Sequence, residues 1–174
     1  DLCLNLFQEN STLKGYTYPM GLERAFELSV YEYGFAFWQW SADCDAIPDS
    51  ESKLNTKVDH LFTIDAPGFF TDKTIDELFP FFYQSYTEMG MYGYRVSPFV
   101  PLTREYKEDF SNYRTFIPAD MNLTYDGTVH KRVLQWLNSD AEDMVFIYGE
   151  YDPWSSTAYS PTGNNNLFRK TISK

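Results

Sequence analysis

Residues 149–154 (Gly-Glu-Tyr-Asp-Pro-Trp) carry the side chain of this sequence that is best suited to acid–base chemistry. They follow an apolar run, residues 144–148, which is typical of a strand buried on both faces of a parallel sheet. Open α/β sheets place active sites just beyond the carboxyl ends of such strands. Because Pro153 favours an extended or turn conformation in the preceding residue, Asp152 is predicted to project from the strand tip, where it could orient a histidine. The alternative is an aspartate that caps a turn.

The other members of a catalytic triad are not found in this sequence. No serine lies in a Gly-x-Ser-x-Gly elbow after an apolar strand, and His60 and His130 both precede Asp152. His130 is predicted to be solvated on the first turn of a helix, and His60 to pair with its neighbour Asp59. The two cysteines, at positions 3 and 44, form no metal motif, so no metal ion or other cofactor is predicted. A disulfide and two free thiols both remain open.

Composition restricts the class of partner. The 174 residues carry a formal net charge of −11, which repels nucleic acid and anionic membrane surfaces. No apolar run approaches the roughly 20 residues that a membrane span needs, so no membrane insertion is predicted. Aromatic residues make up 19% of the chain. This content fits either a surface that grips ligands by flat contacts or a core that uses rings in place of Leu and Val.

Several elements are predicted in the first 121 residues. A helix from Leu22 has an apolar stripe with helical spacing and places Glu32 off that stripe (Leu22, Phe26, Val30 or Ser29, Tyr33, Phe37). Residues 41–55 are predicted to form a loop, and residues 66–68 a turn. A capping box at residues 74–77 indicates a second helix, whose start could slip to Phe79 because Pro80 fits a first turn. That helix is predicted to end at Met89 before Gly90. Residues 96–121 show no period.

The C-terminal part is predicted to be half of a βαβ unit. Residues 126–128 (Asp-Gly-Thr) indicate the start of a helix that ends at residues 138–140 and has one apolar face (Val129, Val133, Trp136, Leu137). The strand at residues 144–148 follows, and its sheet neighbours should be parallel. It is the one buried strand that the sequence predicts. We therefore expect the rest of the sheet to come from outside this chain.

Two motifs resemble a known peptidase family. Residues 149–155 are similar to the acid loop of proline-directed serine peptidases with an α/β-hydrolase core, a clan that includes lysosomal Pro-Xaa carboxypeptidase and dipeptidyl peptidase II. Residues 83–92 resemble their Tyr-Gln-x-Cys-Thr-Glu-x-Gly-x-Tyr segment, with Tyr86 in place of the cysteine. Residues 28–40 and 80–94 most resemble bacterial secreted prolyl tri- and tetrapeptidyl aminopeptidases, serine peptidase family thirty-seven. The resemblance extends over residues 15–174.

This resemblance implies a mainly α fold with two parts. Residues 1–118 would form the helical cap, or lid, domain of an α/β-hydrolase, and residues 119–174 a helix-strand-loop piece of its core. Asp152 would be the acid of a Ser-Asp-His triad whose serine and histidine lie outside this chain. The parent protein would release short peptides from free N-termini after proline, in a bacterial secreted or periplasmic location. The 174 residues alone would be inactive. The partners would be the peptide substrate and the remainder of the core.

The resemblance also implies where a peptide would bind. Glu88, which the motif match favours, would hold the free ammonium group, with Gln84, Trp38 and Trp40 as further contacts. For Trp154 two roles are open: the base of a pocket for a proline ring, or packing against the end of the strand. The alternative is that Gln84 and Glu88 are i,i+4 partners on a solvated helix face and that the rings are core. A rival function is a non-enzymatic, acidic, aromatic-rich envelope module that binds a glycan or a peptide. It explains the ring content and the missing nucleophile but not the acid loop.

Overall fold

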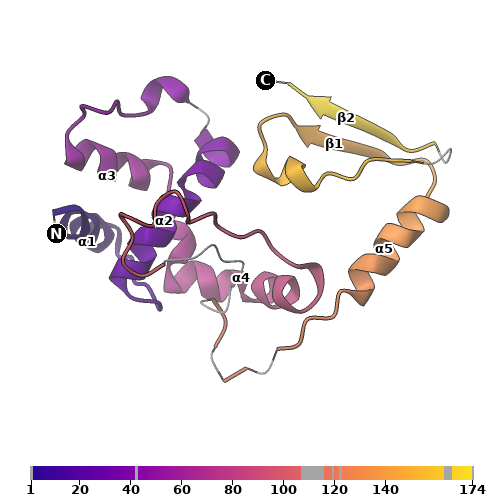
Figure 1. The fold of residues 1–174 in the computed structure, drawn as a ribbon, viewed down its shortest axis with the longest axis horizontal. Helices are drawn as coiled ribbons and strands as arrows, with labels where there is room; N and C mark the ends of the chain where they lie inside the picture. Colours follow the sequence, from indigo (N-terminus) through magenta and orange to yellow (C-terminus); the bar gives the residue numbers. More distant parts are fainter. Residues whose placement is uncertain are drawn as a thin grey trace. The chain divides into compact units, whose positions relative to one another are not determined.

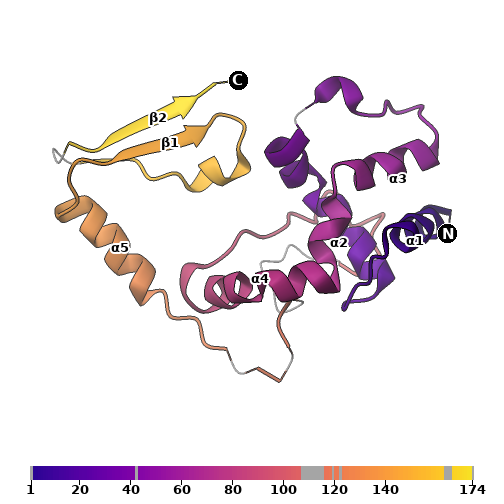
Figure 2. The ribbon, with the colours of Figure 1, turned by 180° about the vertical axis from the view of Figure 1, so that it is seen from behind.

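A computed structural model describes residues 2–41, 43–106, 116–118, 120, 121, 123–162 and 166–173. The chain divides into two compact units (Figures 1 and 2). The first contains residues 1–83 and 91–122, and the second contains residues 84–90 and 123–174. The chain therefore passes from one unit to the other three times. The boundary predicted after residue 118 lies four residues before the last crossing, and no sequence signal indicated that residues 84–90 belong to the second unit.

The first unit is helical, as predicted. Its α-helices are α1 (Leu2–Lys14), α2 (Leu22–Ala36), α3 (Leu54–Thr63) and α4 (Asp72–Gln84). Shorter turns connect them: a π-helix at Phe37–Ser41, and 3-10 helices at Cys44–Ala46 and Ala66–Phe70. The predicted loop at 41–55 and turn at 66–68 thus contain helical turns. Sequence analysis did not find α1, whose apolar residues do not form a clear stripe, and it overlooked α3, whose apolar residues Leu54, Val58, Leu61 and Phe62 do have helical spacing.

Aromatic rings form much of the core of the first unit. Phe7 of α1 is fully buried, and its ring centroid lies 5.7, 5.2 and 5.1 Å from those of Tyr18, Phe26 and Phe62. A second group stacks Phe116 on Phe70 and Phe82 at 5.7 and 4.8 Å. These rings therefore belong to the core, which is one of the two predicted explanations of the high aromatic content.

The buried face of helix α2 includes most of the predicted stripe but is wider than predicted. Val30 is 41% exposed, whereas Glu32, which was expected off the apolar stripe, is 5% exposed. The residues that α2 buries lie on a neighbouring stripe (Ala25, Leu28, Ser29, Tyr31, Glu32, Ala36). Leu22, Phe26 and Tyr33 of the predicted stripe pack against the core, so the prediction was incomplete. The buried face is wider because two layers cover α2: α1 and α3 contact it on one side, and the segment after Met91 contacts it on another.

Helix α4 begins earlier than predicted. Its cap is Thr71, whose hydroxyl oxygen accepts a hydrogen bond from the Thr74 backbone N–H at 3.2 Å. Both predicted starts, at residue 74 and at Phe79, were therefore wrong, and Pro80 lies inside the helix with its ring exposed. After Gln84 the helix continues as a π-helix, η4 (Ser85–Met89). The predicted stop at Gly90 is confirmed: its φ is 79°, and its N–H donates to the Ser85 carbonyl at 2.8 Å.

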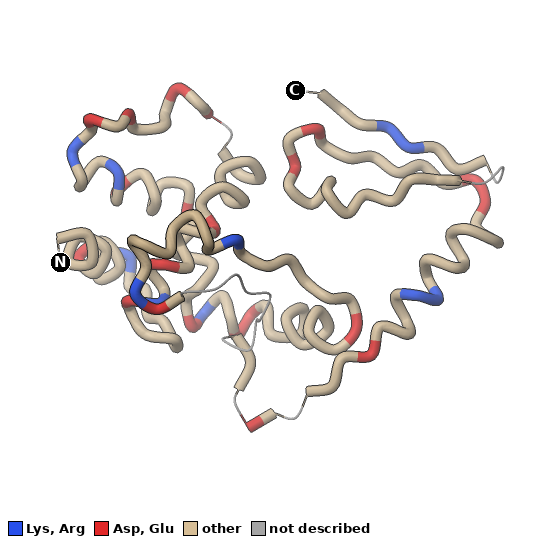
Figure 3. Tube along the Cα trace, in the orientation of Figure 1, with Lys and Arg blue, Asp and Glu red and all other residues tan. Residues whose placement is uncertain are grey.

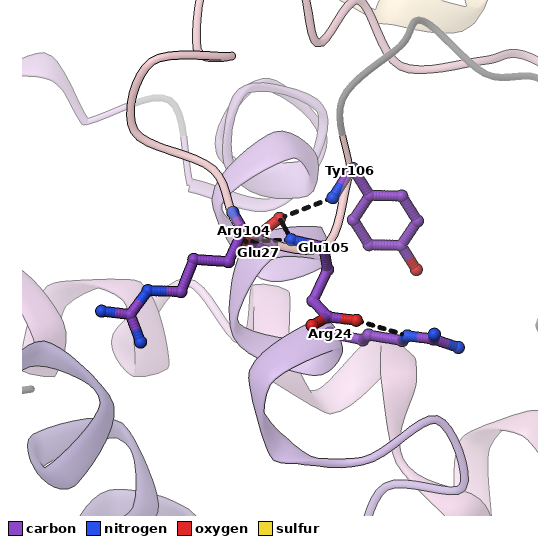
Figure 4. A network of polar contacts seen from close by, with 5 residues as sticks. All are labelled: Arg24, Glu27, Arg104, Glu105 and Tyr106. Carbon is purple, nitrogen blue, oxygen red and sulfur yellow. Dashed lines mark hydrogen bonds and ion pairs between the residues drawn. The ribbon is translucent and has the colours of Figure 1, made fainter.

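A carboxylate of α2 holds the segment that ends at Tyr106 (Figure 4). Glu27 accepts hydrogen bonds from three consecutive backbone N–H groups, those of Arg104, Glu105 and Tyr106, the last at 3.1 Å. Arg24 pairs with Glu105 at 2.8 Å. These contacts join parts of the chain that are about 80 residues apart, so they depend on the tertiary fold and not on local sequence.

The second unit contains a parallel pair of strands. It consists of η4, α5 (Thr128–Ser139), β1 (Val145–Gly149), a 3-10 helix at Pro153–Thr157, η6, and β2 (Phe168–Ile172). Strand β1 pairs in parallel with β2, with Val145 opposite Phe168 and Gly149 opposite Ile172 (Figures 1 and 2). The predicted start of α5 is confirmed, since the Asp126 carboxylate accepts from the Thr128 N–H at 2.9 Å.

Two predictions for this sheet were wrong. The strand at 145–149 is not solitary, because β2 pairs with it. It is also not buried in the described chain: Val145 and Ile147 are 64% and 67% exposed. Of the predicted apolar face of α5, Leu137 is buried, and three residues are about half exposed (Val129, Val133, Trp136). The composition of these elements suits a covered sheet, and the described residues do not supply the cover.

Acidic residues are scattered over both units (Figure 3). Both cysteine thiols are free in the structure: Cys3 is half-buried and Cys44 is exposed. Among the described residues, no helix has both the length and the apolar character that a membrane crossing requires.

Candidate functional site

Asp152 lies in the loop that follows strand β1. It has extended backbone angles (φ −71°, ψ 118°), as expected before Pro153, and it caps the 3-10 helix Pro153–Thr157. Its Oδ1 accepts a hydrogen bond from the Trp154 N–H at 3.0 Å. The side chain is half-buried. Asp152 therefore caps a turn, as the alternative interpretation predicted. Its carboxylate also lies just beyond the carboxyl end of a parallel strand.

Short contacts close this turn onto the strand end. The Ser155 N–H donates to the Asp152 carbonyl at 2.9 Å, and the Ser155 hydroxyl donates to the Gly149 carbonyl at 2.7 Å. A Cβ atom at Gly149 would lie 3.3 Å from the Cβ of Asp152, a tight contact that would push Asp152 by a few tenths of an ångström. Trp154 follows on the turn with 44% of its surface exposed.

Glu88 and Gln84 lie at the transition from α4 to the π-helix η4. Gln84 is the exposed last residue of α4, and Glu88 is half-buried within η4. The Thr87 carbonyl accepts from the Asp126 N–H at 2.6 Å, which attaches η4 to the start of α5 within the second unit. π-Helical turns are rare and are frequent at functional sites because they redirect side chains.

The tryptophans predicted to contact a peptide belong to the first unit. Trp38 and Trp40 lie on the other π-helix, Phe37–Ser41, and are 40% and 80% exposed. The Trp38 ring meets Phe37 edge-on at 5.2 Å. Two π-helices thus carry three of the predicted binding residues. Asp152, Trp154, Gln84 and Glu88 belong to the second unit.

Sequence analysis missed a buried acid in the first unit. The Glu32 carboxylate accepts hydrogen bonds from the hydroxyls of Tyr92, at 3.0 Å, and Tyr94, at 2.5 Å. Burial raises the pKa of Glu32 to about 7, against the opposing effect of the two phenols. The partners are about 60 residues away in the sequence, so no local signal pointed to this cluster.

The two histidines belong to different units, His60 to the first and His130 to the second. The His60 Nε2 is 3.0 Å from the Tyr33 hydroxyl, and the neighbouring Asp59 accepts from the Asn10 amide at 3.1 Å. Both side chains thus have partners that are distant in the sequence, in place of the predicted local pair between His60 and Asp59. His130 is exposed on the first turn of α5, as predicted.

Comparison with known proteins decides the family. A sequence model of the family described as PS-10 peptidase S37 matches residues 7–166. The chain belongs to this family. The match includes all six predicted site residues and ends before β2.

A named relative gives this S37 peptidase further context. The chain is 28% identical over 141 residues to a prolyl tri/tetrapeptidyl aminopeptidase of Streptomyces mobaraensis. The alignment covers 79% of this chain and 29% of the relative, so the chain spans less than a third of that protein's length. No solved structure shows significant similarity to the chain. The resemblance seen in residues 28–40, 80–94 and 149–155 is thus confirmed at the level of the family.

Proposed function

We propose that this chain is the cap and acid-loop part of a serine aminopeptidase that removes short peptides from free N-termini, with cleavage after proline. The reaction is acyl transfer through a Ser-Asp-His triad, in which Asp152 is the acid and residues outside this chain supply the serine and the histidine. One observation carries the proposal: in a chain of the S37 peptidase family, Asp152 stands three residues past the carboxyl end of a parallel strand.

Asp152 acts on the histidine in this proposal through one carboxylate oxygen. Oδ1 accepts from the Trp154 N–H and fixes the carboxylate plane. Oδ2 accepts from the imidazole Nδ1–H, holds the ring in the tautomer that activates the serine, and stabilises the imidazolium that forms. The half-buried position strengthens this electrostatic effect relative to an exposed carboxylate.

The substrate is a peptide with a free N-terminus. Glu88 pairs with its ammonium group, Gln84 adds a hydrogen bond, and Trp38 and Trp40 supply ring faces. Trp154 forms the base of a pocket for the proline ring, beside the acid loop. The two π-helices support this assignment, because they carry Glu88 and the two exposed tryptophans. The name of the Streptomyces relative supports a prolyl tri- or tetrapeptide preference.

The remainder of an α/β-hydrolase core is the proposed macromolecular partner. The described part of the sheet has two strands, and Val145 and Ile147 of β1 are mostly exposed. Parallel sheets are stable when both faces are covered. We assign residues 123–174 to this core, the first unit to the cap, and the protein to a bacterial secreted or periplasmic location. The 174 residues alone are expected to be inactive as a hydrolase.

A labelling experiment tests the role of Asp152. The longer protein that contains this chain is treated with a fluorophosphonate, which reacts with an activated serine. Asp152→Asn is expected to slow labelling by about 10⁴-fold, because the histidine loses the tautomer that accepts the serine proton. Glu150→Gln is the matched control: it removes the same charge two residues away and is expected to leave the rate within about twofold. Equal rates for Asp152→Asn and the parent would contradict the proposal.

The rival function, a glycan- or peptide-binding module, loses its main support. It relied on the high aromatic content, and in the first unit Phe7, Phe62, Phe70 and Phe82 are buried in ring-to-ring contacts. We therefore propose no second function.

A further inference from the structure

Tyr159 closes the acid loop at its far end. The loop leaves β1 after Gly149 and carries Asp152. It returns to the strand at Tyr159, whose backbone N–H donates to the Tyr148 hydroxyl at 3.0 Å. The Tyr159 ring also packs against Phe146 of β1, with a centroid distance of 5.0 Å. The chain segment between β1 and Tyr159 is thus a closed loop held at both ends by the same strand.

The hydroxyl of Tyr159 joins this closure to helix α5. It lies 3.0 Å from the Leu137 carbonyl and 2.9 Å from the Asn138 Oδ1, both acceptors near the end of the helix. The Leu137 carbonyl is among the last four of α5, which have no partner within the helix. One side chain therefore ties the acid loop, the strand before it and the end of the preceding helix together.

Strand β2 secures the same point. The Arg169 guanidinium lies over the Tyr148 ring, 5.3 Å from its centroid, and its Nη1 donates to the Ser160 hydroxyl at 2.7 Å. Tyr148, the acceptor for the Tyr159 N–H, is thereby fixed from the other strand.

These contacts bear on the direction of the Asp152 carboxylate. The turn at residues 152–157 is ordered internally by the bond from the Trp154 N–H to Asp152 and is tied to the end of β1 by the bond from the Ser155 hydroxyl to Gly149. Its placement relative to the sheet depends on this one attachment and on where the loop returns, at Tyr159. A carboxylate that orients an imidazole must be held within about 0.5 Å, and a displacement of about 1 Å can cost on the order of 100-fold in rate.

We propose that Tyr159 is a positioning residue for Asp152, acting through its contacts with β1 and with the end of α5. The proposal rests on the proposed role of Asp152 as the triad acid. Tyr159 makes no contact with substrate in this assignment. It sets the angle at which the acid loop presents its carboxylate.

The test uses the longer protein with Tyr159→Phe, which keeps the ring on Phe146 but removes the hydroxyl bonds to α5. Tyr125→Phe, an exposed tyrosine of the same unit, is the matched control. Active sites are counted by fluorophosphonate titration, and kcat and KM for a prolyl peptide are measured per active site across pH. We expect Tyr159→Phe to lower kcat on the order of tenfold with KM unchanged. We also expect the acid limb of the kcat–pH profile of Tyr159→Phe to move to lower pH, because a displaced carboxylate stabilises the imidazolium less.

A residue that only stabilises the fold would reduce the number of active sites and leave the pH profile of each site unchanged. Unchanged kcat per site and an unchanged acid limb in Tyr159→Phe, with Asp152→Asn strongly impaired, would overturn the positioning role alone. If Asp152→Asn were also as active as the parent, the proposed function would fail and the inference with it.

Discussion

Two glutamates of helix α2 show how the same side chain acquires different properties from its surroundings. Glu27 lies on the surface side of the helix and accepts backbone N–H groups from residues 104–106. Glu32 is buried and accepts two tyrosine hydroxyls. Burial disfavours the charged form of Glu32, so the pKa of this carboxyl rises to about 7 although both phenols oppose the change.

The titration of Glu32 predicts a pH dependence of stability. Its pKa is about 7 in the fold and near 4.5 in the unfolded chain, so the folded state binds more protons between these values. The free energy of unfolding should therefore fall as pH rises through this window, by up to about 3 kcal/mol. Glu32→Gln has no such titration, so its free energy of unfolding relative to the parent should increase from pH 5 to pH 8 by the same amount. Urea unfolding, followed by tryptophan fluorescence at each pH, measures the difference.

Tyr94→Phe is a second variant that tests the titration of Glu32. It removes a hydroxyl that favours the charged carboxylate, so the pKa of Glu32 should rise further and the loss of stability should continue above pH 7. Parallel unfolding curves for Glu32→Gln and the parent across pH 5–8 would show that Glu32 does not titrate in this range.

Local sequence signals predicted residues whose partners are close in the chain. The Asp126 cap, the Gly90 stop and the extended Asp152 before Pro153 follow from neighbours within a few positions, and the structure agrees with each. The burial of Glu32 and the hydrogen bonds from the backbone of residues 104–106 to Glu27 could not be predicted. Their partners lie about 60 and 80 residues away, and the helical period of α2 fits more than one buried face.

At the scale of elements, helix α4 contains a residue that works against it. Pro80 lacks the N–H that would donate to the Asp76 carbonyl, and its exposed ring makes the position independent of core packing. The capping box at residues 74–77 predicted a start later than the Thr71 cap of the structure, which shortened the predicted helix and moved Pro80 toward its first turn.

Pro80→Ala is expected to raise the free energy of unfolding by about 2 kcal/mol, because alanine restores the hydrogen bond and suits a helix interior better. The gain is smaller than the full propensity difference, since alanine also frees the unfolded chain. Glu77→Ala, on the same helix, loses a weak pair with Lys73 at 3.9 Å and should change stability by less than about 0.5 kcal/mol. Thermal and urea unfolding compare the two. A destabilised Pro80→Ala would contradict this account of Pro80.

Strand β2 was missed for a compositional reason. Its residues 168–172 (Phe-Arg-Lys-Thr-Ile) have two adjacent charges and no apolar run, and all five are exposed in the structure. Strand β1 was found because its apolar run is longer. Its predicted burial was wrong for the described residues, because an apolar run does not show what covers it, and Val145 and Ile147 are mostly exposed.

At the scale of the whole molecule, the exposed apolar surface of the second unit has a measurable effect. The largest exposed fraction in β1 is that of Ile147, at 67%, and α5 adds Val129, Val133 and Trp136. An apolar strand edge of this kind promotes association between chains.

The isolated 174-residue chain is therefore expected to bind the dye ANS and to associate as its concentration rises. Ile147→Lys should reduce both by several-fold, because a charge opposes strand-to-strand pairing. Val30→Lys, at an exposed apolar position of the first unit, is the control and should have little effect on either. Light scattering and dye fluorescence report the result. A parent chain that stays monomeric and binds no dye would show that the sheet surface is covered in solution.

The threefold passage of the chain between its two units also constrains how such a protein can be recombined. Residues 84–90 belong with α5, and the Asp126 N–H donates to the Thr87 carbonyl across that contact. An exchange of residues 1–122 between relatives would bring a foreign η4, and with it Glu88, to a resident α5. Residues 1–122 therefore do not form an independent structural unit. Changes in the segment around Glu88 and in the start of α5 should be inherited together.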